Sequence, residues 1–287
     1  MKQKNRNRRV VVTGLGVISA LGLEVSRFWE NLISGKSGVS MIDIFDVEKI
    51  GSKIASQVRD FKPEDYMELK QAKRMDRFAQ FAVAASLNSL KDSGFKINSG
   101  NENEVGVYIG SGVGGLMTTE IQHGRLMTKG ADRVSPFLIP MMICNMASAQ
   151  VSIFSGAKGP VCTSTTACAA GSNAIGDAFE IIKRGAAEVM ITGGSEAAIT
   201  PLGMAGFSNM HALSFRNDEP EKASRPFDRD RDGFVMGEGC GVLILEELSH
   251  ALKRNAKIYC EMFGYGLSGE AYHITALEES GANVARC

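Results

Sequence analysis

Residues 159–179 read GPVCTSTTACAAGSNAIGDAF, a β-like run that gives way to a helix within a few residues. Cys162 lies inside the run, whereas Cys168 falls at the corner, just ahead of three small residues. We predict a helix from about 170 to 184, because its large apolar residues recur on one face. A strand that enters a helix through such a corner is typical of an α/β fold.

The same alternation of elements extends to both sides of this corner. Short β-rich runs end in glycine, and amphipathic segments lie between them. This pattern predicts an α/β fold with a largely buried sheet. The expected strands are 10–13, 105–109, 188–192, 241–245 and 258–264, and the further expected helices are 25–33, 75–90 and 249–254.

Composition narrows the classes of function. The 287 residues carry 32 basic and 32 acidic side chains, so no net field attracts nucleic acid. No apolar run approaches 18 residues, so no membrane span is expected, and the start lacks a signal-peptide pattern, which predicts a cytoplasmic protein. Five of the first nine residues are basic, and we expect a solvated tail rather than a nucleic-acid contact. The six cysteines form no CxxC pair, which argues against a disulfide framework or a metal site.

Two motifs resemble ligand-binding sequences, one for a dinucleotide and one for calcium, but each lacks a residue that the binding site requires. TGLGVISALG, residues 13–22, lacks the third glycine of a dinucleotide fingerprint, so we expect a close-packing turn. DRDRDGFVMGEG, residues 228–239, resembles a calcium loop, but Gly239 stands where the bidentate glutamate belongs. The better interpretation of this segment is a surface loop in which arginines pair with aspartates, the arginines being Arg225, Arg229 and Arg231.

Cys168 is the candidate nucleophile on local grounds. The unpaired N–H groups and the dipole of a helix N-terminus stabilise a thiolate, and backbone N–H groups at the corner could hold an oxyanion. Cysteine also serves commonly as a small buried apolar residue. The local sequence leaves both interpretations open for Cys168, and it predicts a packing role for Cys162.

Four segments together resemble the β-ketoacyl-[acyl-carrier-protein] synthases of the thiolase fold, above all the type II condensing enzymes of bacterial fatty acid synthesis. The resemblance implies a layered α/β/α/β/α fold. In that fold, residues 1–256 would form the N-terminal half that carries the nucleophile, and residues 257–287 would begin the C-terminal half. The segments are VVVTGLGVISALG, GPVCTSTTACAAGSNAIGDAF, GGSEAAITPLGMAGF and ASRPFDRDRDGFVMGEGCGVLILEEL.

The resemblance also implies a mechanism and its residues. Cys168 would take an acyl chain from acyl carrier protein as a thioester, and malonyl carrier protein would then condense with it after losing carbon dioxide. No cofactor is implied. The acyl pocket would be lined by Val113, Leu138 and Phe207, which could instead be ordinary core residues. A homodimer is implied, in which strands near 161–165 pair across the two-fold axis.

A basic segment matches the family's carrier-protein surface. In ELKQAKRMDRF, Lys70, Lys73 and Arg74 are spaced to share one helix face. The resemblance implies that this face docks the acidic carrier protein. A solvated helix face is the alternative.

One departure from the family affects the chemistry. Motifs similar to HGTST and K…TGH…GAAG, which carry two histidines and a lysine in the family, do not occur in residues 1–287. His273 matches a family position upstream of those histidines and does not replace them. We therefore expect this chain alone to be unable to condense. The alternatives are a non-catalytic, chain-length-factor-like partner, a polyketide ketosynthase, and a thiolase-fold acyltransferase that does not decarboxylate.

Overall fold

A computed structural model describes residues 8–287. The described chain forms one six-stranded sheet in the order β5-β4-β6-β7-β1-β8, and a separate two-stranded ladder of β2 and β3. β4 pairs in parallel with both β5 and β6, whereas the pairs β6–β7, β7–β1 and β1–β8 are antiparallel. The strands are β1 (Val10–Ile18), β2 (Ser40–Met41), β3 (Ile54–Ala55), β4 (Val105–Gly110), β5 (Val161–Cys162), β6 (Val189–Glu196), β7 (Gly239–Glu247) and β8 (Cys260–Met262).

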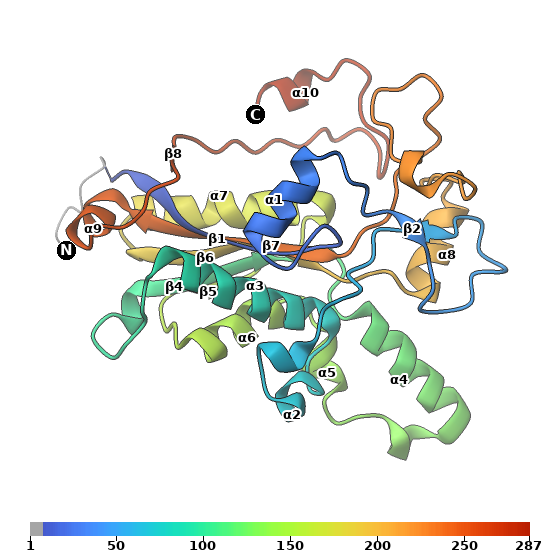
Figure 1. Cartoon of the computed structure of the whole chain (residues 1–287), viewed down its shortest axis with the longest axis horizontal. Helices are drawn as coiled ribbons and strands as arrows, with labels where there is room; N and C mark the ends of the chain where they lie inside the picture. The colour runs from blue at the N-terminus through green and yellow to red at the C-terminus, as the bar shows by residue number, and fades with distance from the viewer. Residues whose placement is uncertain (1–7) are drawn as a thin grey trace.

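Helices cover both faces of this sheet (Figure 1). α3 and α6 pack on one face and α7 on the other, so the α/β class expected from the sequence is confirmed. The α-helices of the described chain are α1 (Val25–Ile33), α2 (Leu69–Ala72), α3 (Arg77–Ser93), α4 (Leu116–Lys129), α5 (Leu138–Met142), α6 (Met146–Ser155), α7 (Ala170–Lys183), α8 (Pro201–Asn209), α9 (Leu248–Lys253) and α10 (Ala282–Ala285).

α3 is the central helix of the larger core. Phe78, Phe81 and a run of alanines are fully buried against the sheet and α6. Asp76 caps its start by accepting the N–H of Phe78, and Gly94 ends it in a left-handed conformation that glycine adopts without strain. A second core lies between the sheet and α7. The two cores fix α3 and α7 on opposite faces of the strands.

The prediction of a glycine-rich turn after Thr13 is wrong. β1 continues through Gly14 and Gly16, with a register shift at Thr13. A Cβ on Gly14 would lie 2.4 Å from the Ser89 carbonyl oxygen, and one on Gly16 would lie 2.0 Å from the Ala85 carbonyl oxygen. These glycines therefore let α3 approach the strand, which confirms close packing at this segment but places it inside the sheet. β6 likewise runs through its two glycines rather than ending before them.

The ends of the described chain are held in different ways. The basic tail predicted for the first nine residues lies mostly outside the described residues, but Arg8 forms a half-buried pair with Glu188, and Arg9 pairs with Glu261. Beyond β8 the chain runs mostly without helix or strand, with Phe263 and Ile274 almost fully exposed. The proposed division between residues 1–256 and 257–287 stays a prediction.

Candidate active site around Cys168

Cys168 lies at the corner that the sequence predicted. β5 ends at Cys162, a short 3₁₀ turn spans Ala167–Ala169, and α7 begins at Ala170. Ala167 has φ of 51°, a left-handed conformation that is uncommon for a residue with a side chain. The Cys168 side chain is exposed and lines a cavity of about 580 Å³. The turn thus presents the thiol to an open space instead of burying it.

Hydrogen bonds from several elements hold this turn. The Ser164 hydroxyl donates to the Ala170 carbonyl at 2.7 Å, and Ser164 itself accepts from Ser111 at the end of β4. The Thr166 hydroxyl bonds the side-chain oxygen of Asn173, and Asn173 Nδ2 donates to the Tyr265 hydroxyl at 2.9 Å. The nucleophile turn is therefore tied both to α7 and to the chain beyond β8.

The cavity brings together two of the three predicted pocket residues. Val113 and Phe207 line the same cavity as Cys168. Phe207 meets Phe234 edge to face, with ring centroids 5.6 Å apart, and the two rings form part of the apolar wall. Leu138 is not among the residues that line this cavity; it is half-buried at the start of α5.

Sequence reasoning missed Glu196, which also lines the cavity. Its carboxylate accepts N–H groups of Gly112 and Val113 at 2.7 and 3.0 Å and the Ser111 hydroxyl at 3.1 Å. Burial raises the pKa of this carboxyl, although the N–H and hydroxyl donors oppose the shift. The segment GGSEAAITPLGMAGF contained this residue, but nothing in its spacing indicated that the carboxylate binds a loop 85 positions away.

The other cysteines differ from Cys168 in their surroundings. The packing role predicted for Cys162 is wrong, because its side chain is exposed on β5, the edge strand of the sheet. Cys240 is fully buried beside the cavity, and burial raises the pKa of its thiol to about 12. Cys144 is half-buried, and burial also raises its pKa. Cys168 therefore combines exposure with a place in the cavity.

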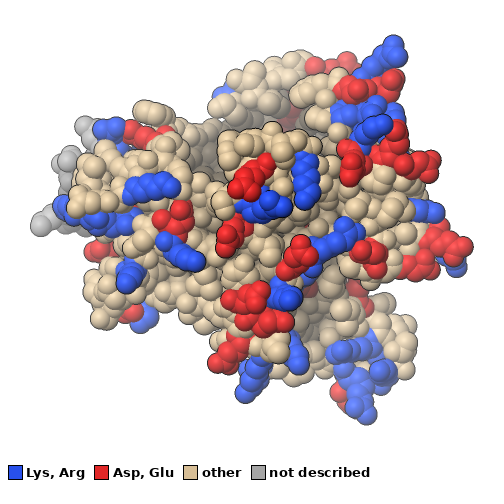
Figure 2. Space-filling view, in the orientation of Figure 1, with Lys and Arg blue, Asp and Glu red and all other residues tan. Residues whose placement is uncertain are grey.

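The predicted docking residues are exposed. α2 is only four residues long, so Lys70, Lys73 and Arg74 lie on one short turn and its end rather than along a helix face. The Arg74 guanidinium stacks 4.6 Å from the centre of the Phe137 ring. Figure 2 shows Lys and Arg side chains along the lower edge, over α2, where Asp and Glu side chains lie beside them, and over the end of α4. A second basic cluster surrounds a separate hollow, and its members are Arg125, Lys129 and Arg133.

The calcium-like segment forms ion pairs. Arg225 lies 3.8 Å from Asp228 and Arg229 lies 3.3 Å from Asp230, as predicted. Arg231 instead donates to the Asp228 carbonyl oxygen, and Arg216 pairs with Asp232. Within residues 8–287, no three His, Cys, Asp or Glu side chains are grouped so that they could hold a metal ion. In the same range, no helix has the length and apolar character to cross a membrane.

Solved structures that share this fold include ketosynthases. The ishigamide ketosynthase/chain length factor superposes with a TM-score of 0.89 at 33% identity, over 97% of this chain and 68% of the other. A type II polyketide synthase acyl-carrier protein in complex with its ketosynthase gives 0.87 at 36% identity, over 98% and 68%. The fold is that of the thiolase-fold ketosynthases.

Sequence comparison defines the family. Residues 7–251 match the model of the beta-ketoacyl synthase N-terminal domain, so the chain belongs to the beta-ketoacyl synthase family. The 3-oxoacyl-[acyl-carrier-protein] synthase 2 of Synechocystis sp. is 54% identical over 279 residues, which cover 97% of this chain and 67% of that protein. The chain thus spans about two thirds of the length of the relatives that it matches.

Proposed function

We propose that this chain provides the acyl-accepting site of a 3-oxoacyl-[acyl-carrier-protein] synthase of fatty acid biosynthesis. The observation that carries the proposal is the exposed Cys168 thiol at the mouth of a largely apolar cavity. A thiol in this position can form a thioester, and the cavity can hold the acyl chain.

The proposed first step is a thioester exchange. The Cys168 thiolate attacks the carbonyl carbon of the acyl carrier thioester, and the carrier's carbon–sulfur bond breaks as the carrier thiol leaves and takes up a proton. Val113 and Phe207 contact the acyl chain, while the open end of the cavity admits the donor. Leu138 stays a predicted pocket residue, since it is not among the residues that line this cavity.

The proposed second step is condensation with malonyl carrier protein. Loss of carbon dioxide leaves a carbanion that attacks the Cys168 thioester carbonyl, forms the new carbon–carbon bond and releases the Cys168 thiolate. Residues 1–287 contain no motif similar to HGTST or TGH. We therefore expect this chain alone to accept an acyl group without forming 3-ketoacyl product.

Mass spectrometry tests the first step directly. After incubation with an acyl carrier protein loaded with a saturated acyl chain, the tryptic peptide of Cys168 should gain the mass of the acyl group. Cys168→Ser should abolish this gain, and Cys162→Ser, at the other exposed cysteine of the same segment, should not. An acyl adduct at another cysteine, or none at Cys168, would contradict the proposal and would favour a non-catalytic, chain-length-factor-like role.

We further propose that acyl carrier protein docks on the exposed basic surface formed by Lys70, Lys73 and Arg74. The neighbouring cluster at the end of α4 is proposed to extend this surface. Complementary charge would speed the encounter, so acylation should slow as salt rises. A Lys73→Glu, Arg74→Glu variant should slow acylation by the carrier protein about tenfold and leave iodoacetamide labelling unchanged. Lys91→Glu, Lys96→Glu, which reverses two exposed lysines at and just beyond the end of α3, is the charge-matched control.

A homodimer is proposed to form through β5. This strand is at the edge of the sheet, Val161 is 40% exposed, and its outer backbone groups have no neighbouring strand among the described residues. Val161→Pro should remove a backbone donor and shift the protein toward monomer in analytical ultracentrifugation. A wild-type protein that sediments as a monomer at all concentrations would overturn this proposal.

A further inference from the structure

Residues 111–114, which follow β4 and precede the N-cap of α4, form part of the cavity wall beside the nucleophile turn. Val113 faces the cavity from this loop. A Cβ on Gly112 would lie 3.3 Å from the Ala167 Cα, so the loop backbone packs closely on the residue that precedes Cys168. A small displacement of the loop would therefore change both the width of the cavity and the space beside the thiol.

Glu196 holds this loop through its backbone. The carboxylate, at the end of β6, accepts the Gly112 and Val113 N–H groups on one oxygen and the Ser111 hydroxyl on the other. Ser111 in turn accepts the N–H of Gly114, so one side chain secures all four residues of the loop. The loop follows the last residue of β4, where the regular ladder to β6 has ended.

No arginine or lysine of the described chain forms an ion pair with Glu196, so the loop's N–H and hydroxyl groups balance its buried charge. A carboxylate without such donors would be costly to bury. The carboxylate is the acceptor that the N–H groups of Gly112 and Val113 share, whereas the Ser111 N–H also donates to the Ser164 carbonyl. Loss of the carboxylate would free Gly112 and Val113, while Ser111 keeps its bond to the Ser164 carbonyl and the nucleophile turn keeps its own contacts to Asn173 and Ala170.

We propose that Glu196 is a positioning residue that fixes the 111–114 loop and thereby determines the length of the acyl chain that Cys168 accepts. This inference rests on the proposed function. With the loop held, Val113 stays against the outer wall and the cavity remains open to a long chain. With the loop released, Val113 moves into the cavity and long chains are excluded before short ones.

The test compares acyl chains of two lengths. Acylation of Cys168 by hexanoyl and tetradecanoyl thioesters is measured by peptide mass spectrometry in the full chain, in Glu196→Ala and in Glu196→Gln. We expect the ratio of tetradecanoyl to hexanoyl rates to fall at least fivefold in Glu196→Ala, while the iodoacetamide rate changes less than twofold. Glu196→Gln should restore most of the ratio, because its amide oxygen can accept both N–H groups and its amide nitrogen can donate to Ser111.

A matched control separates positioning from general stability. Asp76 is a buried carboxylate that also accepts an N–H and a hydroxyl, both from Thr118, but it does not line the cavity. Asp76→Ala should lower the melting temperature without changing the ratio of the two acylation rates. An equal loss of both rates in Glu196→Ala, as for Asp76→Ala, would overturn the inference.

A second probe keeps the inference separate from the proposed function. The rates at which N-methyl and N-octyl maleimide modify Cys168 report on the cavity without any acyl transfer. If wild-type Cys168 accepts no acyl group, the proposed function fails. In that case, the maleimide rates still test the inference: an N-octyl to N-methyl rate ratio that is the same in Glu196→Ala as in wild type would overturn the claim that Glu196 sets the usable length of the cavity. If wild type is acylated and the variant keeps the wild-type ratios, only the inference about Glu196 fails.

Discussion

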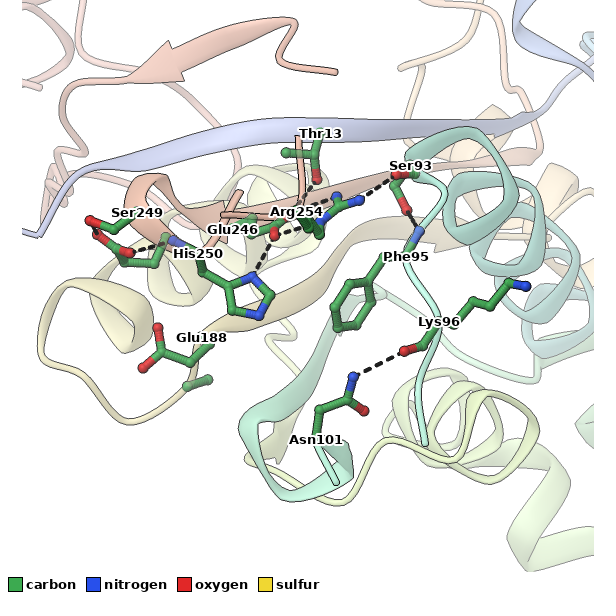
Figure 3. A network of polar contacts seen from close by, with 12 residues as sticks. Thr13, Ser93, Phe95, Lys96, Asn101, Glu188, Glu246, Ser249, His250 and Arg254 are labelled. Carbon is green, nitrogen blue, oxygen red and sulfur yellow. Dashed lines mark hydrogen bonds and ion pairs between the residues drawn. The ribbon is translucent and has the colours of Figure 1, made fainter. Parts of the chain in front are cut away.

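Removing Arg254 tests the buried polar network that joins β1, β7, α3 and α9 (Figure 3). The Glu246 side chain is fully buried, and Arg254 donates to its two oxygens at 2.8 and 2.7 Å. Arg254 also donates to the Ser93 carbonyl at the end of α3, and the Thr13 hydroxyl donates to Glu246. Arg254→Ala would therefore leave a buried carboxylate with only the Thr13 hydroxyl and the His250 ring as side-chain partners.

The expected loss follows from the burial of this pair. Breaking a buried ion pair from one side costs about 3–5 kcal/mol, because the remaining charge is uncompensated. At roughly 2–4 °C per kcal/mol for a domain of this size, the melting temperature should fall by about 6–20 °C. Arg27→Ala is the control, because its pair with Glu30 is 3.4 Å long with both side chains more than 60% exposed. That change should cost about 0–1 kcal/mol.

The loss should also depend on pH. Burial would raise the pKa of Glu246, but hydrogen bonds from Arg254, His250 and Thr13 outweigh it and hold the pKa below its usual value. In the wild type this carboxylate stabilises the fold above its unfolded pKa, and the contribution is lost as pH falls through the lower folded pKa. Arg254 supplies the largest contribution that lowers this pKa, so the folded pKa should rise in the variant and protonation of Glu246 should reduce the loss of stability as pH falls.

Urea unfolding of wild type and variant at pH 7.5 and pH 4.5 measures both effects. The difference in unfolding free energy should be about 3–5 kcal/mol at pH 7.5 and smaller at pH 4.5. A difference below about 1 kcal/mol at pH 7.5, the range of an exposed pair, would refute the reasoning. So would a difference that stays constant between the two pH values.

Three further predictions concern packing and the nucleophile turn. Gly16→Ala should destabilise the protein by about 1–3 kcal/mol in urea unfolding, because the new Cβ would lie 2.0 Å from the Ala85 carbonyl oxygen; an unchanged midpoint would contradict this. Burial raises the pKa of Cys240 to about 12, so this thiol should resist iodoacetamide at pH 8 in the folded protein and react in urea. Asn173→Ala should slow iodoacetamide labelling of the nucleophile at least threefold, because Thr166 loses its partner and the turn relaxes; a labelling rate equal to wild type would show that the turn holds itself.

Local sequence predicted the elements that present an apolar face and missed those that do not. The helix expected from about 170 to 184 matches α7, and the strand expected at 105–109 matches β4. α4 was not predicted, because its buried residues are the polar Thr118 and Gln122, which leave no apolar stripe to detect. β1 was predicted too short, since glycine indicates a turn unless one knows that a helix packs against the strand there.

The sequence predicted the central residue of the candidate site, Cys168, but not the distant residues that hold the site in place. The corner at Cys168 is encoded locally by a short strand, small residues and a helix. Glu196 acts on a loop 85 residues away, and Tyr265 reaches Asn173 across 92 residues. No local periodicity marks such partners, because the contacts exist only after the sheet has brought β4, β6 and α7 together.

The close fit between α7 and the parallel strands explains why the cavity forms beside Cys168. The ladder between β4 and β6 ends at Gly110 and Gly194, and a Cβ on Gly110 would lie 2.1 Å from the Ala170 carbonyl oxygen. The start of α7 therefore rests directly on the carboxyl ends of these strands, where ligand sites of α/β sheets form. Backbone atoms of these elements form the floor of the cavity beside Cys168. The volume of the cavity therefore depends on the 111–114 loop that Glu196 holds and on the wall formed by the Phe207 and Phe234 rings. Cys162, six residues earlier, lies before the corner on an edge strand, and the same geometry leaves it outside the cavity.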